Sequence, residues 1–423
     1  MTVLRNIGLL ATCRPGGGPE ELHPERGAAV AWEDGEIAFV GPEADLPGRF
    51  RGDGVREIDA GGRLVVPGLV DCHTHLAFGG WRAEEFEARV RGASYREIAR
   101  EGGGILSTVR STREAAGDEL VERCRGFLAR MRRLGVTTVE AKSGYGLDRE
   151  TELRLLRVYR RLREGPDAVP ETVVPTFLGA HAVPPEFETD RAGYLDLLTD
   201  ELIPEVARRG LATACDVFVE EGAFSVAEAR AVLEAAREHG LDRRLHADQL
   251  SAGGGAELAA EMGARSADHL EHASDAGVEA MADAGVVAVD LPLASLYLDG
   301  PPMDARRFLE RGADVAVATD FNPGTAPSYH LPLAMTLACT RSRLPPAAAL
   351  KGATLHAARA AGVEERVGSV EPGKRADLAV IDASDPVSWL YHHRPNACML
   401  TVTGGRVTWR ADGERTPATG GAR

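Results

Sequence analysis

Eight short apolar runs alternate with stretches of helical periodicity through the middle of the chain. These runs are residues 64–76, 135–144, 172–181, 215–223, 243–250, 265–272, 285–294 and 314–324. Between them, Ser225 and Glu228 form a capping-box pattern, and residues 151–162 carry apolar residues at helical spacing. Apolar strands that alternate with helices are typical of a parallel sheet covered on both faces. Eight such strands predict an α/β fold, a (β/α)8 TIM barrel over residues 63–363.

Both ends of the chain have a different pattern, in which short strand-like runs are joined by tight turns. Asp34-Gly35 separates two apolar runs near the N-terminus, and Gly404-Gly405 separates two near the C-terminus. Such dipeptides tolerate the positive φ angles that two-residue hairpin turns require. We therefore expect residues 1–62 and 364–423 to form one small β-sandwich-like domain built from both chain termini.

Histidines and an aspartate are found where the predicted barrel strands end, and barrels carry their active sites at these strand ends. His73 and His75 are two residues apart, so on an extended strand their side chains point the same way and could share one metal ion. His246 and Asp320, at the ends of other strands, could complete a set of three imidazoles and one carboxylate. Mixed nitrogen and oxygen ligands suit Zn²⁺, and Fe or Mn nearly as well.

A single Lewis-acid metal acidifies its bound water, so we expect metal-assisted hydrolysis of an amide-like or amidine-like bond. Asp320 is the candidate base that takes the proton of the water, and His269 is the candidate donor to the developing oxyanion. Lys142 leaves an alternative open, because a carbamylated lysine at a strand end can bridge two metal ions. Its place on the second strand, away from the later strand where such a bridge is expected, favours a structural role.

Charge and cysteine content exclude several other classes of protein. The chain has 49 Lys and Arg against 64 Asp and Glu, a net charge of −15, which argues against nucleic acid or an anionic membrane as a partner. The 6 cysteines are widely spread and form no C-x-x-C pair, so we expect no disulfide framework and a reducing compartment. No apolar run approaches the ~20 residues of a membrane-spanning helix. These observations favour a cytoplasmic protein.

Longer motifs, which together extend over nearly the whole chain, resemble those of the amidohydrolase superfamily. They are GLVDCHTHLAFGGWRAEEF, VTTVEAKSGYGLD, PTFLGAHAVP, CDVFVEEGAFS, HAD, ATDFNPGTAP and GSVEPGKRADLAVID. Within the superfamily, the resemblance is to the branch that opens a cyclic amide in histidine degradation. It implies hydrolysis of 4-imidazolone-5-propanoate to N-formimidoyl-L-glutamate by a homodimer with one Zn²⁺ or Fe ion per chain.

The same resemblance implies roles for individual residues. His73, His75, His246 and Asp320 would bind the metal ion. The residues that would contact the substrate are Arg82, Tyr95, Tyr145, His181, Gln249, Asn322, Gly324 and Thr325. A propionate group needs a cationic fork and neutral donors, which Arg82, Tyr145 and the loop 322–325 could supply. Gln249 stands where some relatives have Glu; because an amide cannot act as a base, we assign that work to Asp320 and His269.

Two other functions stay open on the sequence alone. A heterocycle deaminase or another cyclic amidohydrolase would share every metal ligand and differ only around the substrate, although the motifs around Arg82 and Tyr145 count against it. A non-catalytic assembly protein with the same fold would typically lack metal ligands, and this chain retains all of them.

Overall fold

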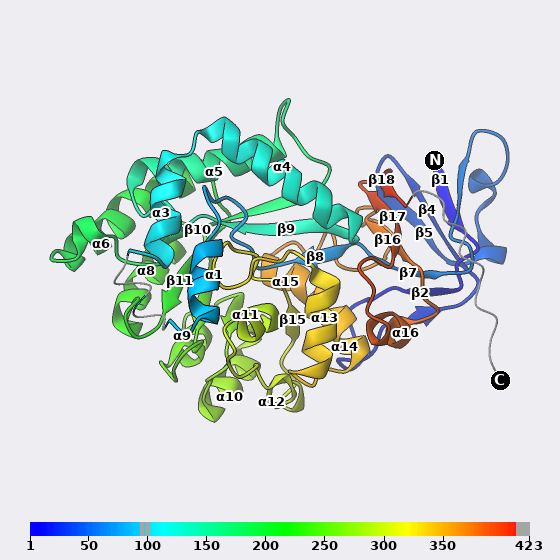
Figure 1. The fold of residues 1–423 in the computed structure, drawn as a ribbon. Helices are drawn as coiled ribbons and strands as arrows, with labels where there is room; N and C mark the ends of the chain where they lie inside the picture. Colours follow the sequence, from blue (N-terminus) through cyan, green and yellow to red (C-terminus); the bar gives the residue numbers. More distant parts are fainter. Residues whose placement is uncertain (94–96, 98–101, 412–423) are drawn as a thin grey trace.

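Eight parallel strands form the wall of the larger part of the molecule (Figure 1). The structure is a computed structural model that describes residues 1–93, 97 and 102–411. Each strand pairs in parallel with the next one along the chain. The strands are β8 (Leu69–Asp71), β9 (Val136–Lys142), β10 (Thr172–Ala180), β11 (Ala214–Val219), β12 (Asp242–Ala247), β13 (Ser266–His269), β14 (Val287–Asp290) and β15 (Val315–Val317).

The segments that follow β8 and β15 meet and close this sheet into a barrel. Thr74 forms a parallel bridge with Phe321, and the His75 amide donates to the Phe321 carbonyl at 2.9 Å. The buried Asp71 carboxylate accepts hydrogen bonds from the Thr319 amide at 3.1 Å and the Thr319 hydroxyl at 2.6 Å. The predicted (β/α)8 barrel is therefore confirmed.

Helices cover the outside of the barrel and connect its strands (Figure 1). The predicted capping box is present at the start of α8, where the Ser225 and Glu228 side chains each bond the other residue's backbone N–H. The helices up to β15 are α1 (Ala83–Val90), α3 (Ile105–Glu114), α4 (Gly117–Arg133), α5 (Arg149–Arg163), α6 (Arg191–Asp196), α7 (Ile203–Arg208), α8 (Val226–Glu238), α9 (Gly255–Glu261), α10 (Asp275–Ala284), α11 (Pro292–Tyr297) and α12 (Ala305–Glu310). After β15 come α13 (Leu331–Thr340), α14 (Pro346–Lys351), α15 (Ala357–Ala361) and α16 (Pro386–Tyr391).

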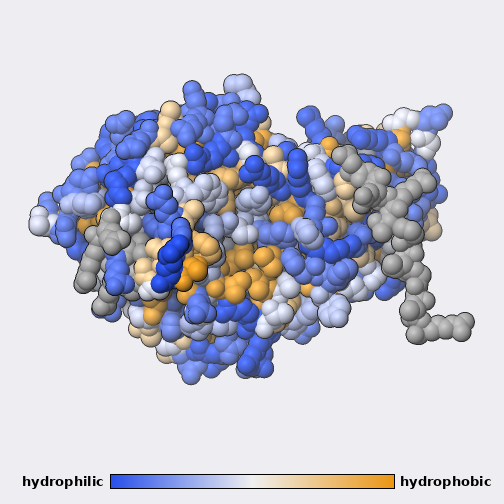
Figure 2. Space-filling view, viewed as in Figure 1, coloured by the Kyte–Doolittle hydropathy of each residue, from blue (hydrophilic) through white to orange (hydrophobic). Residues whose placement is uncertain are grey.

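Short helical turns complete the helical part of the described chain. They are η1 (Glu43–Asp45), η2 (Gly48–Phe50), η3 (Pro185–Phe187), η4 (Leu197–Leu202) and η5 (Gly352–His356). None of the helices among the described residues combines the length and the apolar character that crossing a membrane requires. The face shown in Figure 2 is largely hydrophilic, with an apolar area beside α1 and α11, where Phe86 stacks on Tyr297.

Both chain termini contribute strands to two smaller sheets that lie together at one end of the molecule (Figure 1). The four-stranded sheet contains β5 (Glu36–Pro42), β4 (Ala28–Glu33), β1 (Thr2–Arg5) and β6 (Arg56–Asp59). The six-stranded sheet contains β18 (Arg406–Arg410), β17 (Cys398–Thr403), β16 (Leu378–Ile381), β7 (Leu64–Pro67), β2 (Leu9–Ala11) and β3 (Pro24–Glu25). The two sheets share one apolar core, which includes Leu4, Val30, Val65 and Leu378. The expected sheets from both termini are confirmed, with hairpin turns at Asp34-Gly35 and Gly404-Gly405.

The first predicted run, residues 64–76, belongs to two sheets rather than one strand. Its first part, β7, pairs with β2 and β16 in the six-stranded sheet, whereas its second part, β8, is a barrel strand. Gly68 separates the two parts: its amide donates to the Asp377 carbonyl at 2.8 Å, and a Cβ there would lie 2.2 Å from Thr137 Oγ1. The boundaries at residues 62 and 363 stay a prediction.

The smaller sheets contact the end of the barrel where its strands begin. Arg375 donates to the Thr172 hydroxyl at 2.6 Å and to the Pro170 carbonyl at 2.7 Å, at the start of β10. The Thr401 hydroxyl donates to the Arg132 carbonyl at 2.8 Å, shortly before β9. The opposite end of the barrel, where the strands end, is therefore left for the candidate site.

Candidate active site

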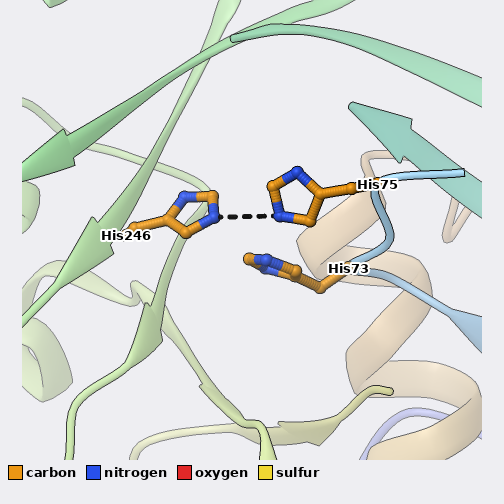
Figure 3. A group of neighbouring side chains, drawn as sticks. All are labelled: His73, His75 and His246. Carbon is orange, nitrogen blue, oxygen red and sulfur yellow. Dashed lines mark hydrogen bonds between the residues drawn. The ribbon is translucent and has the colours of Figure 1, made fainter. Parts of the chain in front are cut away.

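Three of the predicted metal ligands point toward one another inside the barrel (Figure 3). His75 Nε2 and His246 Nε2 lie 3.4 Å apart, and the His73 ring lies beside them, its centroid 4.5 Å from that of His246. The Asp320 carboxylate completes the cluster, because its Oδ1 lies 3.4 Å from His73 Nε2 and 3.5 Å from His75 Nε2. The structure thus brings together His73, His75, His246 and Asp320, as the sequence predicts.

The chemistry of this cluster fits a metal ion. His73, His75, His246 and Asp320 are at most 3% exposed, and His73 Nε2 is buried without a hydrogen-bond partner. When His246 Nδ1 donates to Asp216, 3.1 Å away, the Nε2 atom of His246 keeps its lone pair and directs it toward His75. Burial lowers the pKa of His246 to about 3, which keeps its imidazole neutral. Burial opposes ionisation of Asp320, but the neighbouring His73 and His75 imidazoles hold its pKa well below the ordinary value.

Two buried carboxylates orient the imidazoles of His73 and His246 through their Nδ1 atoms. Asp268 Oδ2 lies 2.5 Å from His73 Nδ1, and Asp216 Oδ1 lies 3.1 Å from His246 Nδ1. When Nδ1 donates to a carboxylate, the ring is fixed and its Nε2 atom is left as the ligand. The sequence analysis did not single out these aspartates. A charged residue inside an apolar strand, as in CDVFV and SADH, is the signal that could have found them.

Lys142 connects the two aspartates beneath the site. Its Nζ donates to Asp216 Oδ2 at 2.7 Å and Glu140 Oε1 at 3.0 Å, and it lies 3.7 Å from Asp268 Oδ2. Burial alone would lower the pKa of Lys142, but the carboxylates of Asp216, Glu140 and Asp268 raise it. Carbamylation requires a neutral amine, so this environment supports the structural role over a bridge between two metal ions.

Tyr145 and His181 lie next to the metal-facing histidines. The His181 ring stacks on His75 with centroids 5.0 Å apart, and the Tyr145 ring is 5.5 Å from His75 and 5.4 Å from His181. Burial, with the neighbouring His75 and His246, lowers the pKa of His181 well below its ordinary value. Because His181 is neutral and its Nδ1 donates to the Gly144 carbonyl at 3.0 Å, its Nε2 is an acceptor.

Arg82 lies against the loop that follows β15. Its side chain is only 9% exposed, its Nε is buried without a hydrogen-bond partner, and Glu85 Oε2 is 3.8 Å from one terminal nitrogen. A Cβ added to Gly324 would lie 1.0 Å from Arg82 Nη2, so the guanidinium occupies the space that glycine leaves open. The structure therefore joins the predicted Arg82 and Gly324 in one place.

The Asn322 side chain shapes the same loop from within. Its Oδ1 accepts from the Gly324 amide at 2.8 Å and the Thr325 amide at 2.7 Å, and its Nδ2 donates to the Asp320 carbonyl at 2.7 Å and the Thr325 hydroxyl at 2.9 Å. Both ends of the amide are thus engaged inside the loop. Substrate binding by Asn322 and Thr325 stays a prediction.

The remaining predicted residues have less definite surroundings. His269 ends β13 with its ring centroid 5.5 Å from that of His246, and Gln249 follows β12 and is partly buried. Tyr95 lies outside the described residues. His269 and Asp320 both have positive φ, 81° and 52°, a conformation rare for non-glycine residues and found most often where function requires it.

The fold and the His and Asp cluster define an amidohydrolase, and the chain belongs to the amidohydrolase family, whose model matches residues 64–407. Within it, the chain belongs with the imidazolonepropionases. It is 49% identical to "Imidazolonepropionase" of Geobacillus thermodenitrificans over 89% of this chain and 88% of that protein. It is 50% identical to the protein of the same name from Symbiobacterium thermophilum over 90% of each.

Solved structures with the same fold are more distant in sequence. Guanine deaminase of E. coli has a TM-score of 0.74 at 15% identity, covering 97% of this chain and 99% of that chain. An adenosine deaminase from Xanthomonas campestris with bound zinc has a TM-score of 0.71 at 20% identity, covering 96% and 92%. At these identities the likeness concerns the fold alone.

Proposed function

We propose that this protein hydrolyses the cyclic amide bond of 4-imidazolone-5-propanoate to N-formimidoyl-L-glutamate in histidine degradation. The observation that carries the proposal is the loop after β15, which supplies Asp320 to the metal cluster and holds the buried Arg82 guanidinium against Gly324. A metal site and a cationic fork on one loop suit a small cyclic amide with a carboxylate tail. The kinship with imidazolonepropionases supports the same substrate.

In the proposed reaction, water adds to the ring carbonyl carbon, the ring C–N bond breaks, and the departing nitrogen takes up a proton. His73, His75, His246 and Asp320 hold one Zn²⁺ or Fe ion per chain. When bound, this ion supplies a Lewis acid that acidifies water and polarises a carbonyl group. Asp320 is ionised, so its carboxylate takes the proton of the attacking water and returns it to the departing nitrogen. His269 donates a hydrogen bond to the developing oxyanion.

The substrate-binding residues divide between the tail and the ring. Arg82 pairs with the propionate, assisted by the backbone of Gly324 and Thr325, in a loop that Asn322 shapes. Around the ring, the proposed contacts are those of Tyr95, Tyr145, His181 and Gln249. As an amide, Gln249 hydrogen-bonds the substrate without moving a proton.

The proposal also includes the setting of the enzyme in the cell. A cytoplasmic location is supported by the six cysteines, all of which are free. Small-molecule chemistry, without nucleic acid or membrane, agrees with the net charge of −15. A homodimer is proposed from the resemblance described above.

Removal of the metal ion tests the proposed function. We expect the protein to consume fresh 4-imidazolone-5-propanoate, measured by the loss of its ultraviolet absorbance. Treatment with a chelator, followed by dialysis, abolishes this turnover, and adding back Zn²⁺ or Fe²⁺ restores it, because the proposed hydrolysis depends on an ion held by this ligand set.

A mock dialysis without chelator is the control for losses in handling. If elemental analysis shows that the protein is metal-free and its turnover is still complete, the metal-dependent mechanism is contradicted. Absence of turnover by protein with one metal ion per chain contradicts the substrate and leaves another cyclic amide or amidine to be screened.

The carboxylate contact is tested separately with Arg82→Ala. Loss of a charged hydrogen bond costs about 1.5–3 kcal/mol, so we expect KM to rise by about 10- to 100-fold while kcat changes little. Steady-state kinetics measure both constants. Arg91→Ala, whose side chain is 75% exposed at the end of α1, is the matched control and leaves KM unchanged. If KM is unchanged in Arg82→Ala, Arg82 does not bind the propionate group.

A further inference from the structure

The loop between β9 and α5 surrounds a buried carboxylate that has no role in the proposed reaction, neither in metal binding nor in substrate binding. Glu152, in the first turns of α5, is fully buried. Its Oε1 accepts hydrogen bonds from the amides of Gly144 at 3.1 Å, Gly146 at 2.8 Å and Leu147 at 3.0 Å, and its Oε2 accepts from Gly144 at 3.1 Å. Three backbone N–H groups of residues 143–147 thus converge on one side chain.

This arrangement depends on an unusual backbone and on a negative charge. Gly144 and Leu147 have positive φ, 100° and 55°, which turns successive N–H groups toward the inside of the loop. Gly146 leaves no room for a side chain, since a Cβ there would lie 2.6 Å from the Glu152 amide. Burial raises the pKa of the Glu152 carboxyl, while the N–H donors oppose that shift. An ionised carboxylate satisfies such donors better than a neutral group does.

The loop carries two groups that face the metal-binding histidines. Tyr145 projects from it, with its ring 5.5 Å from that of His75. The Gly144 carbonyl accepts a hydrogen bond from His181 Nδ1 at 3.0 Å, which fixes the tautomer of His181. Gly144 therefore links both sides: its N–H binds the Glu152 carboxylate, and its C=O orients the His181 ring.

We propose that Glu152 is a positioning residue, whose carboxylate holds the loop 143–147 so that Tyr145 and the correct tautomer of His181 are presented to the substrate. The substrate contacts of Tyr145 and His181 rest on the proposed function. The shape of the loop does not, because it is set by hydrogen bonds inside the protein.

The test replaces Glu152 by glutamine, which keeps the size of the side chain and removes its charge. One of the two positions facing the loop then carries an NH₂ group, which opposes the Gly144 N–H instead of accepting from it. Hydrogen–deuterium exchange followed by mass spectrometry is expected to show at least about tenfold faster exchange at residues 144–147, with exchange in the barrel strands unchanged. Glu150→Gln, an exposed position on the same helix, is the matched control and leaves the loop protected.

Kinetics distinguish positioning from general support of the fold. KM for 4-imidazolone-5-propanoate is expected to rise about tenfold in Glu152→Gln. Adding Glu152→Gln to Tyr145→Phe is expected to raise KM less than Glu152→Gln alone does, because part of its effect acts through the Tyr145 contact that Tyr145→Phe has already disturbed. If the effects of the two substitutions instead multiply, or if exchange rises throughout the barrel, Glu152 is a structural residue and the proposal is overturned.

Failure of this inference can be told apart from failure of the proposed function. If the wild-type enzyme does not turn over the substrate, the function fails, and hydrogen exchange still tests whether Glu152 holds the loop. If the wild-type enzyme is active and the loop of Glu152→Gln stays protected, the positioning role fails alone. Should the glutamine variant not fold, Glu152→Asp withdraws the carboxylate by one methylene and is expected to give the same local rise in exchange.

Discussion

We expect Asp320→Asn and His246→Ala each to yield a folded protein that has lost its metal ion and at least about a hundredfold of its activity. The cluster offers four buried ligand atoms, and either substitution removes one of them. Changing a residue that only orients a ligand typically costs 10–100-fold in metal affinity or activity, so loss of a ligand costs more. Asparagine also cannot accept a proton, which is the role proposed for the Asp320 carboxylate. Metal content per chain, kcat/KM and far-ultraviolet circular dichroism are the three measurements.

His239→Ala is the matched control for the histidine, because His239 is exposed at the end of α8. It is expected to keep the metal content and the activity of the wild type. Near-normal turnover in both Asp320→Asn and His246→Ala would rule out the single-metal mechanism. Loss of activity with the metal content unchanged would mean that other residues bind the ion.

We expect Lys142→Met to destabilise the folded protein by about 3–5 kcal/mol, the usual cost of removing one partner from a buried ion pair. The Lys142 ammonium lies within 3.7 Å of the carboxylates of Glu140, Asp216 and Asp268, all fully buried. Once it is removed, Arg244, 2.9 Å from Glu140, is the nearby cation left among the described residues of this cluster. Urea unfolding of metal-free wild type and variant measures the loss of stability without a contribution from metal binding.

Lys351→Met is the matched control, since Lys351 is also buried but donates to the carbonyls of Gly16 and Gly18. Loss of hydrogen bonds to neutral groups costs about 0.5–1.5 kcal/mol each, so this variant is expected to lose less stability. An equal loss of stability in the two variants would mean that the charge of Lys142 is not needed to stabilise the carboxylates around it.

The barrel could be predicted from the sequence because its strands form short, largely apolar runs that are separated by clear helical patterns. The error at residues 64–76 has a physical cause: β7 and β8 are both completely buried, so the apolar pattern does not change where the chain leaves one sheet for another. The division is revealed by the different strand partners of β7 and β8 and by the contacts of Gly68 with Thr137 and Asp377.

The gathering of His73, His75, His246 and Asp320 could be predicted because these residues follow strand ends, where a barrel gathers its functional residues. Asp216, Asp268 and Glu152 could not, because their roles depend on contacts between distant parts of the chain. Asp268, for example, orients a histidine 195 residues away in the sequence. The charge of Asp268 is visible in the sequence, but its partner is set by the closed barrel.

The closure of the barrel places the proposed metal ligands on both sides of the join between its first and last strands. His73 and His75 flank Thr74, and Asp320 precedes Phe321, the residue that Thr74 bridges. A metal ion held here is a removable cross-link between parts of the chain about 248 residues apart, as measured by the Asp71–Thr319 pair. By thermodynamic linkage, an ion bound at this site would favour the closed ring over any partly opened one, so metal supply and the lifetime of the folded enzyme would be coupled.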